Sequence, residues 1–244
     1  MKTWIAFWSI FYKDIKTYYL KPPNISWGII FPFAWGLMFF IRSGSALDIR
    51  SIVPGVVAVS ILFGTTSLLA VTITFEKRRK TFDRLLLAPI SFELLMLAKT
   101  SGAVLFGVLN AFVPIGVGAV LAGLSGTAWL PLVLGVVFIA ISSTFLGLFI
   151  AVSVAEVFEA QTFSNFFRFP MLFLCGLFFP IERLPVFLQP LSYILPLTYG
   201  ADILRGTVTH NHRLPLWLDF IVLLLFCVTL FLLSLRNVKR KWIL

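Results

Sequence analysis

The sequence predicts an all-α integral membrane protein with six membrane-spanning helices. Of its 244 residues, 59% are hydrophobic and only 12% are charged, whereas soluble proteins average about 25% charged residues. A chain of this composition has too few polar side chains to cover a surface that faces water. It also contains six long apolar runs, and about 20 apolar residues are needed to cross the hydrocarbon core of a bilayer. We therefore treat residues 1–244 as a single transmembrane domain.

The first element expected is an amphipathic helix over residues 1–21. Its apolar stripe contains Trp4, Trp8, Phe11, Ile15 and Tyr19, and its polar face includes Lys13 and Lys16. A helix of this kind lies in the plane of the inner leaflet, with its tryptophans at the depth of the headgroups. Pro22 and Pro23 should end it before the first span. A simple membrane anchor is the alternative interpretation.

The six predicted spans cover residues 24–41, 52–75, 94–121, 129–155, 164–180 and 215–235. The fifth has a short uncharged core, so it either starts before Arg168 or continues as apolar backbone that re-enters the membrane. Ionisable residues at the bilayer centre mark ion or proton pathways. Here Lys99, Glu156 and Glu159 fall near the inner ends of their spans, where we expect long side chains to reach water.

The distribution of positive charge predicts the orientation. With both termini in the cytoplasm, all but five of the 20 lysines and arginines lie on the inner side, as the positive-inside rule requires. The five on the outer side are Arg42, Arg50, Arg183, Arg205 and Arg213. The net charge of +10 therefore reflects topology, and no soluble segment is long enough to form a basic nucleic-acid-binding face. We expect a multi-pass protein of the cytoplasmic (inner) membrane that contacts lipid and no nucleic acid.

The most polar segment is the inner loop between the second and third spans, residues 76–90. It predicts a short amphipathic helix on which Phe82, Leu85 and Leu86 form an apolar ridge, with basic residues beside it and Pro89 at its end. A ridge of this size suits docking against a partner. A basic loop that only orients the chain is the alternative.

The outer segment between the fifth and sixth spans, residues 181–214, is too apolar for an ordinary loop. Short helices that dip back into the outer leaflet would satisfy its backbone polar groups, so we expect a re-entrant segment. Asp202 and Arg205 are three residues apart and can pair on a helix there. His210 and His212 in the following loop predict an exposed turn in preference to a metal site.

Enzymatic motifs are missing from the sequence. It has no G-x-x-x-x-G-K-[ST] phosphate loop, no H-E-x-x-H and no G-x-S-x-G. We therefore predict no catalytic residue, no metal site and no cofactor in this chain, which should not bind ATP by itself.

The inner loop and the outer segment resemble those of the membrane subunit of type-2 ATP-binding-cassette (ABC) exporters, the family of daunorubicin-resistance, nodulation-factor and polysaccharide permeases. The inner-loop match consists of Glu76, Thr81, Asp83, Leu85, Leu86, Pro89, Ile90 and Ser91. Lys80 stands where the family often has glycine. The outer match consists of Gly176, Phe178, Phe179, Pro180, Leu184, Pro185, Pro196, Leu197, Thr198, Tyr199, Asp202 and Arg205.

This resemblance implies a half-transporter, in which two copies of the chain form a pathway above two copies of a separate ATPase subunit that binds ATP and Mg²⁺. It implies outward transport of a hydrophobic or amphipathic substrate such as a drug, a lipid or a lipid-linked glycan. The implied coupling residues are Glu76, Arg78, Arg79, Thr81, Phe82, Asp83, Arg84, Leu85, Leu86 and Pro89. The implied outer gate comprises Phe178, Phe179, Pro180, Pro196, Tyr199, Asp202 and Arg205.

Two other classes of function stay open at this point. One is a gradient-driven secondary transporter or channel, in which Glu156 and Glu159 would carry the coupled ion. The other is a membrane-embedded enzyme or scaffold that works without nucleotide.

Overall fold

The computed structural model of the chain describes residues 2–43, 48–87 and 90–240, and every regular element in these ranges is helical. The elements are α1 (Lys2–Asp14), the π-helical turn η1 (Ile15–Tyr19), α2 (Pro22–Ile25), the π-helical turn η2 (Ser26–Ile30), α3 (Phe31–Ser43), α4 (Ile49–Arg78), α5 (Thr81–Leu86), α6 (Phe92–Ala122), α7 (Trp129–Ser153), α8 (Val157–Leu174), the 3₁₀ turn η4 (Ile181–Arg183), α9 (Gln189–Tyr193), α10 (Pro196–Thr209) and α11 (Leu216–Val238).

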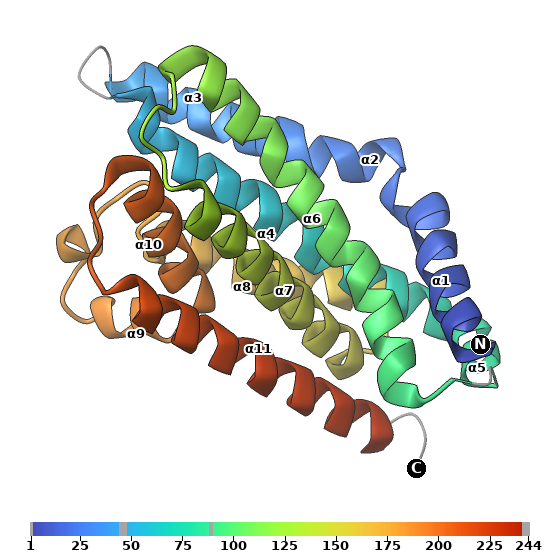
Figure 1. The fold of residues 1–244 in the computed structure, drawn as a ribbon. Coiled ribbons are helices and arrows are strands. Elements are labelled where there is room, and N and C mark those ends of the chain that lie inside the picture. The colour runs from blue at the N-terminus through green and yellow to red at the C-terminus, as the bar shows by residue number, and fades with distance from the viewer. Residues whose placement is uncertain (1, 44–47, 88–89, 241–244) are drawn as a thin grey trace.

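The long helices form one elongated bundle (Figure 1). The start of α1, helix α5 and the end of α11 lie toward one end of this bundle, and α9 and α10 lie toward the other. The predicted inner loop and the predicted outer segment are therefore at opposite ends, as the expected topology requires.

Four helices are long and apolar enough to cross a membrane, namely α4, α6, α7 and α11. They coincide with the predicted spans at residues 52–75, 94–121, 129–155 and 215–235. The other two predicted spans fall on α3, which is short and follows a π-helical turn, and on α8, which carries Glu159 and Arg168. The six-span arrangement thus stays a prediction, whereas the all-helical membrane architecture is confirmed.

Helix α4 forms the centre of the bundle and is buried along most of its length. It packs against α3, α6, α7, α8 and α10. The approach of α7 is close at Gly147, where a Cβ atom would collide with the backbone carbonyl of Thr66 in α4. Glycine at this position therefore allows the two helix backbones to meet.

Replacing Gly147 with alanine is expected to lower the free energy of unfolding by about 1–3 kcal/mol, because a methyl group enters a contact that has no room for it. Gly116→Ala in α6 is the matched control, since a Cβ there meets nothing within 4 Å, and helix propensity favours alanine by about 1 kcal/mol. Thermal unfolding can be followed with a maleimide dye that reacts when the buried free Cys175 and Cys227 become exposed. Equal unfolding temperatures for the two variants would contradict the close contact.

The fifth predicted span differs from the observed helix at both ends. Helix α8 begins at Val157 and ends at Leu174, six residues before the predicted limit at Pro180. It ends there because Gly176 has φ 71°, a left-handed conformation that terminates helices. The helix thus begins before Arg168, whereas the re-entry of the apolar backbone that follows stays a prediction.

The N-terminal helix forms as predicted, the chain changes direction between α1 and α2 (Figure 1), and α2 begins at Pro22. Trp4 and Trp8 are exposed, as expected for side chains that face lipid. Tyr19, which was expected on the same stripe, is instead buried against Phe106 of α6. The π-helical turn η1 explains the difference, because its wider turn shifts the register of the residues that follow Asp14.

Candidate functional site

The inner loop is built around Phe82, which is only 1% exposed. Its ring packs in a hydrophobic cluster with side chains such as Ile10 of α1, Ile73 of α4 and Met96 of α6. Leu85 and Leu86 pack partly against the same cluster. The predicted apolar ridge is therefore directed mainly into this chain, and the expectation that Phe82 offers an exposed docking surface is wrong.

The turn that leads into α5 depends on Lys80, which has φ 56° and ψ 16°. This left-handed conformation is easy for glycine and costs other L-residues about 1–2 kcal/mol. The structure thus shows lysine in a conformation that suits glycine, the residue that the family resemblance leads us to expect at this position.

Behind the loop lies a cluster of four charged side chains, three of which are buried. The Nζ atom of Lys99 in α6 is 2.9 Å from Asp14 Oδ2 and 2.6 Å from Glu76 Oε2. The Nζ atom of Lys13 is 2.8 Å from Asp14 Oδ1 and 2.6 Å from Glu76 Oε1. Each carboxylate therefore meets two ammonium groups, and the cluster is formally neutral.

This charged cluster joins three segments that are distant in the sequence: α1, the inner end of α4, and α6. Lys99, Asp14 and Glu76 are buried in it, so the expectation that Lys99 reaches water is wrong. Burial acts to lower the pKa of Lys13, but Asp14 and Glu76 raise it above its ordinary value. Lys13 thus stays charged at neutral pH and closes the cluster on its exposed side.

The outward face of the loop is strongly basic. Its exposed side chains are those of Arg78, Arg79, Lys80, Thr81, Asp83, Arg84 and Leu87. Leu87, directly after α5, is 85% exposed, an unusual position for a large apolar side chain in a charged loop. Pro89, which was predicted to end the helix, lies outside the described residues.

Glu156 and Glu159 start helix α8 at the same end of the bundle. Together they form a capping box, in which Glu159 accepts hydrogen bonds from the backbone N–H groups of Ala155 and Glu156. These bonds to Ala155 and Glu156 lower the pKa of Glu159. Glu156 also pairs with Arg78, and both side chains are more than half exposed. The two acids therefore have local structural roles.

In the outer segment, Asp202 and Arg205 of α10 do not pair with each other, contrary to expectation. Asp202 accepts hydrogen bonds from the backbone N–H groups of Arg213 and Leu214, at 3.0 Å and 2.9 Å. Arg205 donates to the carbonyl oxygen of Gly176. Each side chain is directed to backbone outside regular helices. Asp202 thus ties α10 to the connection that leads into α11, and Arg205 ties α10 to the segment that follows α8.

The remaining predicted gate residues lie around α9 and α10. Tyr199 donates a hydrogen bond of 2.8 Å to the carbonyl of Tyr193, and Pro196 is buried at the start of α10. Phe179 and Pro180 are exposed, and Phe178 packs against the core. The segment contains the short elements η4, α9 and α10, and its re-entry into the membrane stays a prediction.

Comparison with known proteins agrees with the two motifs. A family model described as ABC-2 type transporter matches residues 5–209. The chain belongs to this family. The match includes the N-terminal helix, the inner loop and α10, so both motif-bearing segments of this ABC-2 permease fall within it.

Relatives of the permease cover nearly its whole length. The inner membrane transport permease YadH of Escherichia coli K12 is 24% identical over 246 residues, which is 97% of this chain and 96% of the relative. Nodulation protein J of Rhizobium meliloti is 26% identical over 247 residues, which is 98% of this chain and 93% of the relative. The chain is thus a multi-pass inner membrane permease, the non-catalytic membrane component of an ABC transporter, and its general partner is an ATP-binding subunit.

The sequence did not identify Asp14 and Lys99 as partners in a charged cluster. Asp14 interrupts an otherwise aromatic and basic helix, and Lys99 interrupts an apolar run. An acid and a base that each stand inside apolar sequence are a signal for pairing, because neither is stable alone in the membrane. Their separation of 85 residues left the partner unidentified.

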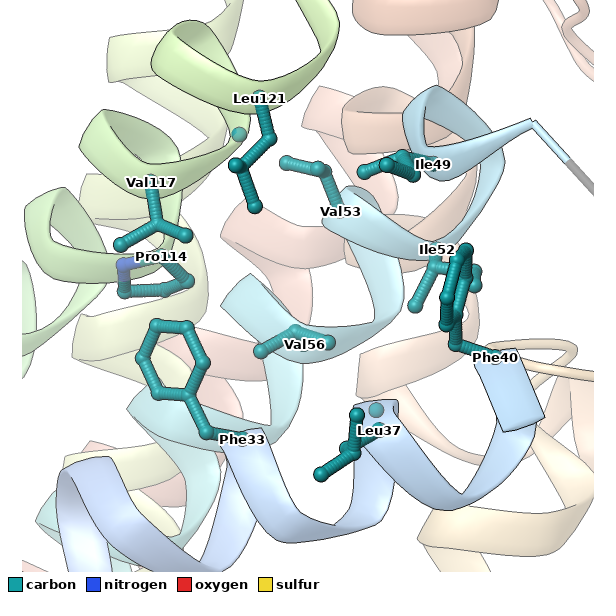
Figure 2. Close-up of a pocket in the computed structure, with 12 residues that line it drawn as sticks. Phe33, Leu37, Phe40, Ile49, Ile52, Val53, Val56, Pro114, Val117 and Leu121 are labelled. Carbon is teal, nitrogen blue, oxygen red and sulfur yellow. The ribbon is translucent and has the colours of Figure 1, made fainter.

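Two of the cavities formed by the described residues differ in character. One, of about 250 Å³, is lined by apolar side chains from α3, α4 and α6. Figure 2 shows Phe33 and Leu37 of α3, Val56 of α4 and Pro114 of α6 around this space. The other, of about 470 Å³, lies between the N-terminal segment, α4 and α8, and it has a mixed polar and apolar lining.

Proposed function

We propose that this ABC-2 permease is the membrane half of an ATP-driven exporter, in which two copies form the pathway and two ATPase subunits bind at the cytoplasmic loops. In this proposal both termini are cytoplasmic, and ATP and Mg²⁺ are bound by the partner. The cargo is hydrophobic or amphipathic, such as a drug, a lipid or a lipid-linked glycan, and it moves outward.

The observation that carries the proposal is that the inner loop is attached firmly to the helix bundle on one face and exposed on the other. One face of α5 is fixed to the bundle through Phe82, and the adjoining end of α4 is fixed through Glu76 in the charged cluster. The opposite face is exposed and bears Arg79, Arg84 and Leu87. A partner bound to the exposed face would therefore move α1, α4 and α6 together, as rigid-body coupling requires.

The chemistry of the exposed face fits a protein partner. An apolar anchor surrounded by charged side chains is a common interface pattern, in which the anchor supplies burial and the charges supply orientation. Leu87 would be the anchor, with Arg79, Asp83 and Arg84 around it. Arg78 would act indirectly, because it holds Glu156 at the start of α8.

The proposal also assigns roles to the ends of the bundle. Helix α1, with Trp4, Trp8 and Phe11 beside lipid, would slide along the inner leaflet when the loop moves. The turn η1, with Ile15 packed on the bundle and Lys16 exposed, would move with it. The outer segment, including Phe178, Phe179, Pro180, Pro196 and Tyr199, would close the pathway on the outer side. Asp202 and Arg205 would hold the segments of that gate together through their hydrogen bonds to the backbone of Leu214 and Gly176.

The first test is whether an ATPase subunit accompanies the tagged chain through gentle purification from its native membrane. We expect an ATP-hydrolysing subunit to co-elute, and we expect substrate movement in vesicles to require ATP. A chain that purifies alone, and that responds to a proton or sodium gradient, would overturn the proposal. Glu156→Gln and Glu159→Gln would then test the gradient-driven alternative, since both should leave an ATP-driven transporter active.

A further inference from the structure

The larger cavity contains a charged group that the proposed coupling mechanism does not use. Arg168 of α8 lines this cavity and is only 2% exposed. Its Nη1 atom donates to Ser67 Oγ at 3.0 Å and to the carbonyl of Phe63 at 3.4 Å, and its Nη2 atom donates to Asn165 Oδ1. The guanidinium also stacks over the ring of Phe63, 4.4 Å from its centroid.

All of these partners are neutral. The buried Nε atom of Arg168 has no hydrogen-bond partner, and the described part of the chain places no carboxylate beside the guanidinium. Lys99, the other deeply buried cation named above, contrasts with it, because Lys99 contacts two carboxylates. A buried cation without a counter-charge is unfavourable, so Arg168 is positioned for an anion from outside the described chain.

The cavity around Arg168 has room for that anion. Its volume of about 470 Å³ is within the range of small-molecule sites. Among its described lining residues, Lys21 and Arg168 are cationic and none is acidic. Lys21 is exposed at the rim, so an incoming anion would meet it before it reaches the guanidinium.

One part of the lining is suited to an apolar group. Phe63, Leu68, Val71 and Phe75 follow one side of α4, and the span from Phe63 to Phe75 corresponds to about 18 Å along a helix. Trp27 lies opposite in the N-terminal segment and is exposed at the edge of the cavity. A molecule with an anionic head and an alkyl tail would satisfy the arginine and the apolar wall together.

We infer that this cavity is a binding site for an amphiphile with a phosphate-like anionic head, held by Arg168 and guided by Lys21. Arginine suits this role because its planar fork of N–H groups matches the oxygens of a phosphate. The interpretation of the bound amphiphile as cargo rests on the proposed exporter function, whereas the binding itself does not. The nearby end of α4 leads to the inner loop, so the site would load from the inner leaflet.

The test uses the purified full-length chain in an uncharged detergent and measures equilibrium binding of radiolabelled dodecyl phosphate. We expect inorganic phosphate to compete at least about tenfold more weakly, and dodecyltrimethylammonium not to compete. Arg168→Gln should weaken binding at least about tenfold, because it removes the charge-assisted bonds. Arg168→Lys should bind more tightly than Arg168→Gln but more weakly than the wild type, because lysine keeps the charge and loses the planar fork. The matched control is Arg183→Gln, an exposed arginine of η4, which should bind as the wild type does.

Several results would overturn the inference. These are equal affinity of the Arg168→Gln and Arg183→Gln variants, equal competition by the cationic amphiphile, and equal competition by inorganic phosphate. If Arg168→Gln does not accumulate, the Lys21→Gln variant tests the inference in its place, because an exposed position tolerates substitution. This variant should bind dodecyl phosphate a few-fold more weakly than the wild type, and unchanged affinity would overturn the inference. Absence of wild-type binding, together with loss of self-association in Arg168→Gln, would assign the arginine to a contact between copies. The assay needs no ATPase, so it can fail while co-purification of the partner succeeds.

Discussion

Replacing Lys99 with methionine is expected to lower the free energy of unfolding of the permease by about 3–5 kcal/mol, the usual effect of removing one partner from a buried ion pair. Lys99 Nζ is the group that separates the Asp14 and Glu76 carboxylates on their buried side. Without it, Lys13 alone balances two buried anions. Unfolding by sodium dodecyl sulfate titration in mixed micelles, followed by circular dichroism, measures the change.

Lys239→Met is the matched control for this prediction. Lys239 pairs with Glu93 at 2.8 Å, but the side chains are 54% and 49% exposed, and exposed pairs contribute at most about 1 kcal/mol. Adding Glu76→Gln to Lys99→Met should restore part of the stability, because it removes one of the uncompensated charges. If Lys99→Met and Lys239→Met unfold at the same sodium dodecyl sulfate concentration, the charged cluster does not contribute the expected stability.

Replacing Leu87 with aspartate is expected to abolish the partnership with the ATPase while the permease stays folded. Leu87 is 85% exposed, so the substitution disturbs little within the chain. At the centre of a proposed interface, however, a buried carboxylate replaces an apolar anchor, and central anchors contribute about 2 kcal/mol or more. The amount of co-purified ATPase should fall at least about tenfold, with the unfolding temperature unchanged.

Two comparisons make this experiment specific. Val186→Asp changes a similarly exposed apolar residue in the outer segment, and it should leave co-purification intact. Phe82→Ala should lower the stability of the chain itself by about 3–5 kcal/mol, because its ring is buried. Undiminished recovery of the ATPase with Leu87→Asp would remove Leu87 from the proposed interface and would leave the basic side chains to account for it.

The positions of the helices followed from local sequence. The apolar run at residues 129–155 became α7, Trp129–Ser153, and the run at 94–121 became α6, Phe92–Ala122. The short inner helix also appeared inside its predicted range, as α5. Such elements are readable because helix length, apolar composition and the Pro and Gly signals act over a few residues.

The orientation of side chains within those helices was less predictable. Phe82 was expected on an exposed ridge but is buried, and Asp202 was expected beside Arg205 but binds a backbone turn. An amphipathic stripe indicates that one helix face is apolar, yet lipid, a partner and the protein core satisfy such a face equally. Which of them covers it depends on segments elsewhere in the chain.

The sequence by itself determined that this protein is a helical membrane protein of the type-2 ABC permease kind, and it located the inner loop and the outer segment. These conclusions rest on composition and on short motifs, which are local properties of the chain. Only the tertiary structure decided that Lys99 meets Asp14 and Glu76. It also decided that Arg168 lines a cavity in which the described residues supply no counter-charge. Pairing and burial of charge depend on which distant helix faces come together, and that is a property of the packed bundle alone.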